Sequence, residues 1–109
     1  MTSSAEVVVT AIVHVRPEAR EEALAALTTG IEATHGEDGC IAYALHEDNT
    51  DNARFVIVEK WASQDALQAH GDAEHLKAMF GVVGPLLAEP PVIVFTTPLN
   101  VGDPAKATI

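Results

Sequence analysis

Two predicted strands are apolar on both of their faces, and this limits what the chain can fold into. The segment 6–15 is mostly Val, Ile, Thr and Ala, and residues 55–58 read Phe-Val-Ile-Val. Side chains point alternately to the two faces of a strand, and an antiparallel sheet with one wet face would alternate apolar and polar residues. A chain of 109 residues forms one domain. Helices can then cover one face of the sheet, and we expect the same face of a second copy, related by a two-fold axis, to cover the other.

The order of the predicted elements is β-α-β-β-α-α-β. Pro17 suits the first turn of a helix, while Ser63 and Asp72 are placed to cap two shorter helices. We expect strands at 6–15, 40–47, 54–62 and 91–97, and helices at 17–35, from 63 and from 72. This order predicts an α+β fold, the ferredoxin-like split βαβ arrangement with an antiparallel sheet and a broken second helix. We expect one domain over residues 1–109, with its core at about 6–99 and a tail at 100–109.

Charge and cysteine content argue against several classes of protein. Six basic and sixteen acidic residues give a net charge of −10, which repels nucleic-acid phosphates and anionic membrane surfaces. With Cys40 as the sole cysteine, no disulfide can form within the chain, and the first six residues lack the features of a secretory signal. No apolar stretch approaches the ~20 residues that cross a bilayer. We therefore expect a cytoplasmic protein that binds neither nucleic acid nor membranes.

Glu59 and Trp61 share one face of the third predicted strand with apolar residues. A carboxylate in that position needs a partner. Two interpretations are open for Glu59: a pocket acid or base with a raised pKa, or a structural acceptor for a nearby histidine, lysine or backbone N–H. Trp61 is either a core residue or, in a pocket, an N–H donor to a developing oxyanion.

His70 follows Leu67 by three residues and therefore shares the core-facing side of the predicted helix. It is either a buried structural histidine or a general base. Tyr43, on the second strand, either offers its phenol to a substrate or lies at the solvent edge. His75 follows His70 by five residues, about 140° around a continuous helix. The pair is not expected to bind a metal, and the sequence predicts neither a metal nor a bound cofactor.

Three segments of the chain resemble the antibiotic biosynthesis monooxygenase family. They are residues 39–43, 55–63 and 66–70, which read GCIAY, FVIVEKWAS and ALQAH. The resemblance extends from about Val7 to Leu99, nearly the whole chain. Within the family, the chain is similar to small members described as quinol or polyketide monooxygenases. It implies a dimeric α+β barrel, which agrees with the strands that are apolar on both faces.

The resemblance also implies a site. It places a pocket between the helices and the sheet, into which Trp61 and His70 project. His75, Met79 and Phe80 would lie along the helical wall of this pocket. We treat these positions as expectations for the structure.

The function that the resemblance implies is a cofactor-independent monooxygenase. It would oxidise a small electron-rich aromatic, a quinol or an anthrone-like polyketide, with O₂. A deprotonated phenol or enol can give an electron to O₂, so the protein need only deprotonate the substrate and hold the anion in a dry pocket. In this hypothesis His70 is the base, Trp61 and Tyr43 donate hydrogen bonds to the anion, and Glu59 orients the histidine or a strand neighbour.

Two other functions stay open at this point. A non-oxidative isomerase or decarboxylase would use the same base and consume no oxygen. A small-molecule-binding protein without catalysis would be favoured if Met79 and Phe80 filled the pocket, because function depends on the site and not on the fold. The sequence leaves the substrate, the product and the identity of the base open.

Overall fold

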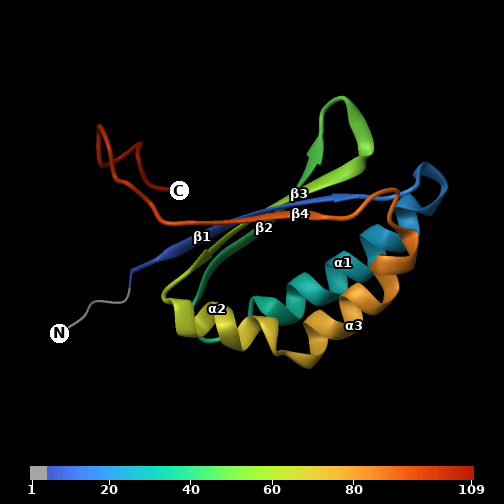
Figure 1. The fold of residues 1–109 in the computed structure, drawn as a ribbon, viewed down its shortest axis with the longest axis horizontal. Helices are drawn as coiled ribbons and strands as arrows, with labels where there is room; N and C mark the ends of the chain where they lie inside the picture. The colour runs from blue at the N-terminus through green and yellow to red at the C-terminus, as the bar shows by residue number, and fades with distance from the viewer. Residues whose placement is uncertain (1–4) are drawn as a thin grey trace.

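A computed structural model describes residues 5–109 and confirms the predicted α+β order (Figure 1). The elements are β1 (Val7–His14), α1 (Arg20–Thr34), β2 (Cys40–Asp48), β3 (Asp51–Trp61), α2 (Gln64–Gly71), α3 (Glu74–Val83) and β4 (Val92–Thr96). Short 3-10 helices precede α1 at Pro17–Ala19 and follow α3 at Gly84–Leu86. Residues 1–4 lie outside the described residues. The expected start of the domain and the expected lack of a secretory signal both involve these residues.

The four strands form one antiparallel sheet in the order β2-β3-β1-β4. This is the ferredoxin-like arrangement, in which the two central strands are the ones whose sequences are apolar on both faces. Val9 in β1 pairs with Glu59 of β3 on one side and with Phe95 of β4 on the other. The register therefore sets Glu59 in the middle of the sheet, in one row with two apolar neighbours.

The two faces of the sheet have different surroundings (Figure 1). All three helices lie against one face, where Val9, Ala11 and Ile57 are buried. Within residues 5–109, no helix lies over the opposite face, and Val92 and Val94 of β4 are about half exposed there. The tip of the β2–β3 hairpin and the C-terminal tail both turn toward this uncovered face. A single chain thus leaves an apolar sheet face in water, as the strand pattern predicted.

Two glycines allow close approaches that position the helices. A Cβ on Gly30 of α1 would lie 2.5 Å from the Met79 Sδ of α3, so the glycine lets these helices pack closely. Gly39 has a φ of +83°, and a Cβ there would lie 2.5 Å from the Cβ of Ala66. The connection between α1 and β2 consequently passes directly against α2.

The capping predictions were half right. The Ser63 Oγ accepts a hydrogen bond from the Ala66 N–H at 3.1 Å and begins α2 as expected. Asp72 does not cap α3: it ends α2, and Ala73 precedes α3 without a side-chain cap. Within residues 5–109, no helix has the length and apolar character needed to cross a membrane.

Candidate active site

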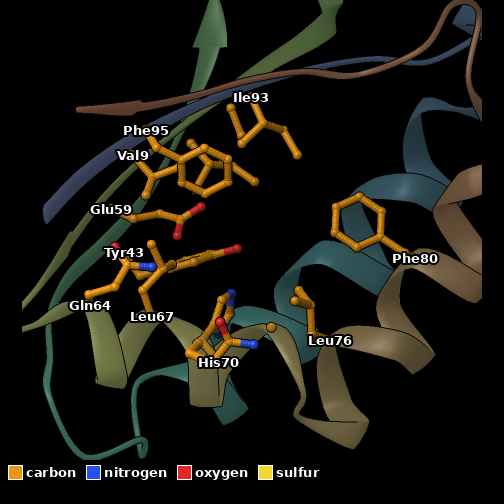
Figure 2. A pocket seen from close by; sticks show the side chains of 14 residues that line it. Val9, Tyr43, Glu59, Gln64, Leu67, His70, Leu76, Phe80, Ile93 and Phe95 are labelled. Atoms are coloured by element: carbon orange, nitrogen blue, oxygen red, sulfur yellow. The ribbon is translucent and has the colours of Figure 1, made fainter.

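A cavity of about 290 Å³ lies between the helices and the covered face of the sheet (Figure 2). Its volume is close to the lower end of the range of roughly 300–1,000 Å³ for small-molecule sites. The wall is largely apolar, and the polar side chains in it are Tyr43, Glu59, Gln64, Gln68 and His70. An apolar cavity with a few convergent polar groups is the usual form of a ligand site.

His70 lies in the last turn of α2 and points into this cavity (Figure 2). It is 4% exposed, and its Nδ1 lies 2.8 Å from Oε2 of Glu37. A carboxylate only accepts, so the shared hydrogen belongs to Nδ1, and in the neutral imidazole Nε2 then carries a lone pair. Nε2 has no hydrogen-bond partner within the described part of the chain, which leaves it available to a molecule in the cavity.

Sequence reasoning missed Gln64 and Gln68 of the cavity wall, and it missed Glu37, which holds His70 from behind. Glu37 lies in the connection between α1 and β2 and contacts two histidines, since the Nε2 of His75 is 2.6 Å from the same Oε2 that binds His70. Glu37 is 33 residues away from His70, and no spacing rule links them. The only signal was a carboxylate between two glycines at a predicted helix end.

Glu59 lies on the sheet side of the cavity with its carboxylate directed inward (Figure 2). Its Oε1 accepts a hydrogen bond from the Trp61 Nε1–H at 2.9 Å. Burial raises the pKa of Glu59, while the hydrogen bond from Trp61 and the proximity of His70 act against this increase. Glu59 is thus a carboxylate on the cavity wall, and its donor is the Trp61 indole instead of the expected histidine, lysine or backbone N–H.

Tyr43 extends from β2 into the cavity, with its hydroxyl toward the interior (Figure 2). Its ring centre lies 5.4 Å from that of His70. Burial is the main cause that raises the pKa of Tyr43, and repulsion from Glu59 and Glu37 adds to it. The phenol therefore stays protonated and can donate a hydrogen bond to an oxygen in the cavity.

The other four predicted residues lie in different places relative to the cavity. Trp61 has no exposed surface and lies behind the cavity wall, with its ring centre 4.6 Å from that of His70. Its N–H is engaged by Glu59, so the expected donation to a substrate oxyanion is not available. Phe80 lines the cavity as expected. His75 and Met79 do not; they line a second hollow against α1, and their expected place on the cavity wall was wrong.

The expectation that His70 and His75 cannot share a metal ion also needs correction. It assumed one continuous helix, but the chain leaves the helical path between α2 and α3, and both histidines converge on Glu37. The three ligand atoms lie within 4.8 Å of one another, which makes this group a candidate metal site.

Phe80 and Met79 leave the cavity open. A binding protein without catalysis would have been favoured if these two side chains had filled the pocket, and this condition is not met.

Comparison with known proteins places this architecture in a family. The model of the family described as antibiotic biosynthesis monooxygenase matches residues 6–81, well over half of the chain. The chain belongs to the antibiotic biosynthesis monooxygenase family. The matched range includes Tyr43, Glu59 and His70, and it ends before β4.

Curated relatives and solved structures agree with this assignment. The chain is 35% identical over 85 residues to "Putative monooxygenase Rv0793" of Mycobacterium tuberculosis, covering 78% of this chain and 83% of that protein. It is 30% identical over 90 residues to "Putative monooxygenase YcnE" of Bacillus subtilis, covering 83% and 95%. The solved structure of Rv0793 superposes with a TM-score of 0.84 at 32% identity, covering 91% of this chain and 100% of that one.

A third relative is longer than this chain. "Uncharacterized protein sll1783" of Synechocystis sp. is 33% identical over 84 residues, which are 77% of this chain and 57% of that protein. The chain thus spans little more than half the length of that relative. The printed names of these three relatives give no substrate.

Proposed function

We propose that the protein is a monooxygenase that oxidises a small electron-rich aromatic, a quinol or an anthrone-like polyketide, with O₂ and without a flavin or metal in the reaction. The family and the names of two relatives support oxygenase chemistry at a coarse level. The observation that carries the finer proposal is His70, whose Nδ1 is bound by Glu37 while Nε2 faces an apolar cavity. This is the arrangement of a general base whose orientation and tautomer are fixed by a carboxylate.

The chemical steps follow from the residues around the cavity. His70 Nε2 takes a proton from a phenol, or from the carbon acid of an anthrone, and the resulting anion gives electrons to O₂. Tyr43 can donate a hydrogen bond to the anionic oxygen, since its own phenol resists ionisation. Apolar side chains such as Leu67, Phe80 and Phe95 surround the aromatic ring and exclude water.

The oxidation balances without an external reductant. In the anthrone case a ring CH₂ becomes C=O; in the quinol case a ring C–H becomes C–OH as the diol becomes a quinone. Either way one oxygen atom of O₂ enters the organic product. The other leaves as water with two hydrogens of the substrate, and the substrate supplies all four electrons.

We also propose that two copies of the chain pack through their uncovered sheet faces. Val56 and Val58 of β3 lie on that face with Val92 and Val94 of β4, because the register alternates them with the buried rows. β4 is an edge strand, and its Ile93 and Phe95 line the cavity on the covered side. A partner that orders β4 would thereby also support the rim of the site.

The experiment is oxygen uptake by metal-stripped protein with a panel of quinols and anthrones, together with mass analysis of products formed under ¹⁸O₂. We expect uptake above the autoxidation blank for at least one compound and one ¹⁸O atom in its product. The His70→Ala variant should lose activity by on the order of 10²-fold or more. Lys77→Ala, at an exposed residue of α3 that lies on neither the cavity wall nor the uncovered sheet face, is the control and should keep it.

The opposite results are informative. No uptake above the blank on any panel member, with a folded protein, argues for a non-oxidative enzyme or a binding protein. Uptake that is unchanged in His70→Ala would contradict the role of this histidine.

A further inference from the structure

Glu37, His70 and His75 bring three potential metal ligands together where three segments of the chain meet. Oε2 of Glu37 lies 2.8 Å from Nδ1 of His70 and 2.6 Å from Nε2 of His75. All three ligand atoms lie within 4.8 Å of one another. Two imidazole nitrogens and one carboxylate oxygen are a ligand set that binds Zn²⁺ with a position left open for water. We propose that these side chains form a binding site for one Zn²⁺ or a similar divalent transition-metal ion.

The backbone holds the ligands in place. The Glu37 N–H donates to the Thr34 carbonyl at 3.0 Å, and the Glu37 carbonyl accepts from the Cys40 N–H at 3.3 Å. At the end of α2, the His70 carbonyl accepts from the Ala73 N–H at 3.1 Å, and α3 begins one residue later. Because the ligands come from segments far apart in the sequence, the site exists only in the folded protein. Binding would therefore stabilise the folded state.

The charge around Glu37 favours a cation. Its side chain is 14% exposed, and within residues 5–109 its ion-pair partners are the two histidines, without a lysine or arginine. A desolvated carboxylate needs compensation. Glu59 is close enough for repulsion from Glu37 to contribute to its raised pKa. A divalent ion would offset this concentration of negative charge in a chain of net charge −10.

The geometry needs only small movements to accept the ion. Zn²⁺ binds nitrogen and oxygen at about 2.0–2.1 Å, so tetrahedral ligands lie about 3.4 Å apart. The present separations from Glu37 Oε2 are 2.8 Å and 2.6 Å, those of hydrogen bonds. Tetrahedral binding would lengthen these two separations by about 0.6 and 0.8 Å and bring the two histidine nitrogens, now within 4.8 Å of each other, to about 3.4 Å. Side-chain shifts of up to about an ångström would therefore exchange the two shared hydrogens for the metal.

Metal binding at this site would change which ring nitrogen of His70 carries the hydrogen. The effect of this change on catalysis rests on the proposed function. Without a metal, the hydrogen lies on Nδ1 and Nε2 can accept a proton from a substrate. With a metal on Nδ1, neutral His70 carries its hydrogen on Nε2 and can only donate into the cavity. The ion would lie on the Glu37 side of the ring, so it would inhibit the oxygenase and take no part in the reaction.

The binding test uses Co²⁺, whose visible absorption reports its ligands, added to metal-stripped protein, followed by displacement with Zn²⁺. We expect saturation at one Co²⁺ per chain and loss of the Co²⁺ absorption bands when Zn²⁺ is added. His75→Ala and Glu37→Gln should weaken binding by more than about 100-fold, beyond the effect of an outer-shell change. His46→Ala is the control and should bind as the wild type does. Circular dichroism verifies that each variant is folded.

Two results would overturn the metal site: no Co²⁺ binding to the wild type, or equal binding by His75→Ala. The His75 side chain is 29% exposed, so this variant is suited to remain folded if Glu37→Gln does not. These measurements need no substrate, and a failure of the proposed oxygenase activity would leave them valid.

The inhibitory role is tested separately by oxygen uptake. We expect Zn²⁺ to inhibit the wild type, a chelator to restore its activity, and His75→Ala to be insensitive to the ion. Activation by Zn²⁺ or Fe²⁺ would overturn the inhibitory role and indicate that the ion takes part in the reaction.

Discussion

The indole N–H of Trp61 donates to the Glu59 carboxylate across 2.9 Å on one face of β3. Lys60 lies between them in the chain and points to the other face of the sheet, so the side chains of Glu59 and Trp61 share one face. Trp61 is fully buried and Glu59 is 5% exposed. The strand therefore holds a carboxylate at the sheet side of the cavity, with one donor fixed to one of its oxygens.

Replacing this carboxylate by its amide should stabilise the protein at neutral pH. Because the pKa of Glu59 is raised by folding, the ionised form is disfavoured in the folded state, and wild-type stability falls as the pH rises through the raised pKa. Glu59→Gln keeps an acceptor for Trp61 and carries no charge. We expect a higher Tm than wild type at neutral pH and a difference that vanishes below the ordinary pKa of 4.5. Glu32→Gln, at an exposed position of α1, should show no such pattern.

Glu37→Gln should reduce catalysis by changing how His70 is held. A carboxylate only accepts hydrogen bonds, whereas an amide can donate to Nδ1 and move the hydrogen to Nε2. We expect kcat to fall by roughly 10²- to 10⁴-fold with little change in KM, because the tautomer matters for proton transfer and not for binding. The neighbouring Asp38→Asn makes the same charge change at an exposed residue. Equal kcat values for the two variants would contradict the positioning role.

Asp48 should contribute stability that is lost in acid. Its Oδ1 accepts from the Thr50 N–H and hydroxyl at 2.7 and 2.8 Å, and its Oδ2 accepts from Arg54 at 3.2 Å. The backbone hydrogen bond from Thr50 is the largest cause that lowers the pKa of Asp48 from 3.8 to about 2. The ionised group therefore stabilises the hairpin above pH 3.8, and this contribution disappears as the pH falls through about 2.

The check is the free energy of unfolding of wild type and Asp48→Asn as a function of pH. We expect the variant to be less stable near neutral pH and the two curves to converge toward pH 2, the lowered pKa. Comparing the curves removes the effect of other carboxyl groups that titrate in the same range. Asp38→Asn serves as the control, and curves that run parallel for Asp48→Asn would contradict the assignment.

The sheet and its two faces could be predicted because they depend on local patterns. A two-residue alternation fixes which side chains share a face, so Glu59 and Trp61 were expected together before the structure placed them. The positions of α1 and the hairpin follow from proline and turn residues, which act on the backbone nearby. Ser63 caps α2 by accepting a hydrogen bond from the N–H three residues later. This prediction was confirmed because it also depends on a local contact.

The parts that could not be predicted depend on helix phase and on distant contacts. Each residue turns a helix by about 100°, so the break after α2 resets the direction of every later side chain. His75 and Met79 consequently point away from the cavity, although the family resemblance placed them on its wall. Glu37 meets His70 because Gly39 brings its loop against α2, a tertiary approach that no local pattern reports.

A charge on the uncovered face should separate the proposed dimer. Val94 is 49% exposed in the single chain, so Val94→Asp should cost the monomer little but place a carboxylate in the contact between two sheets. We expect light scattering to show a dimer for wild type and a monomer for this variant. Val82→Asp makes the same change at a residue of α3 that is 43% exposed, and should leave the dimer intact. A monomeric wild type would contradict the sheet-to-sheet contact.

Gly39→Ala should destabilise the fold and disturb the site through one backbone position. The φ of +83° lies in the left-handed region, and the new Cβ would approach the Cβ of Ala66 to 2.5 Å. Left-handed backbone costs roughly 1–2 kcal/mol and overpacking roughly a further 1–3 kcal/mol, so we expect a loss of about 2–5 kcal/mol in denaturant unfolding. Gly81→Ala, whose Cβ would meet nothing within 4 Å, is the control. A stable Gly39→Ala protein with unchanged Co²⁺ binding would show that the loop need not press against α2 to set Glu37 beside His70.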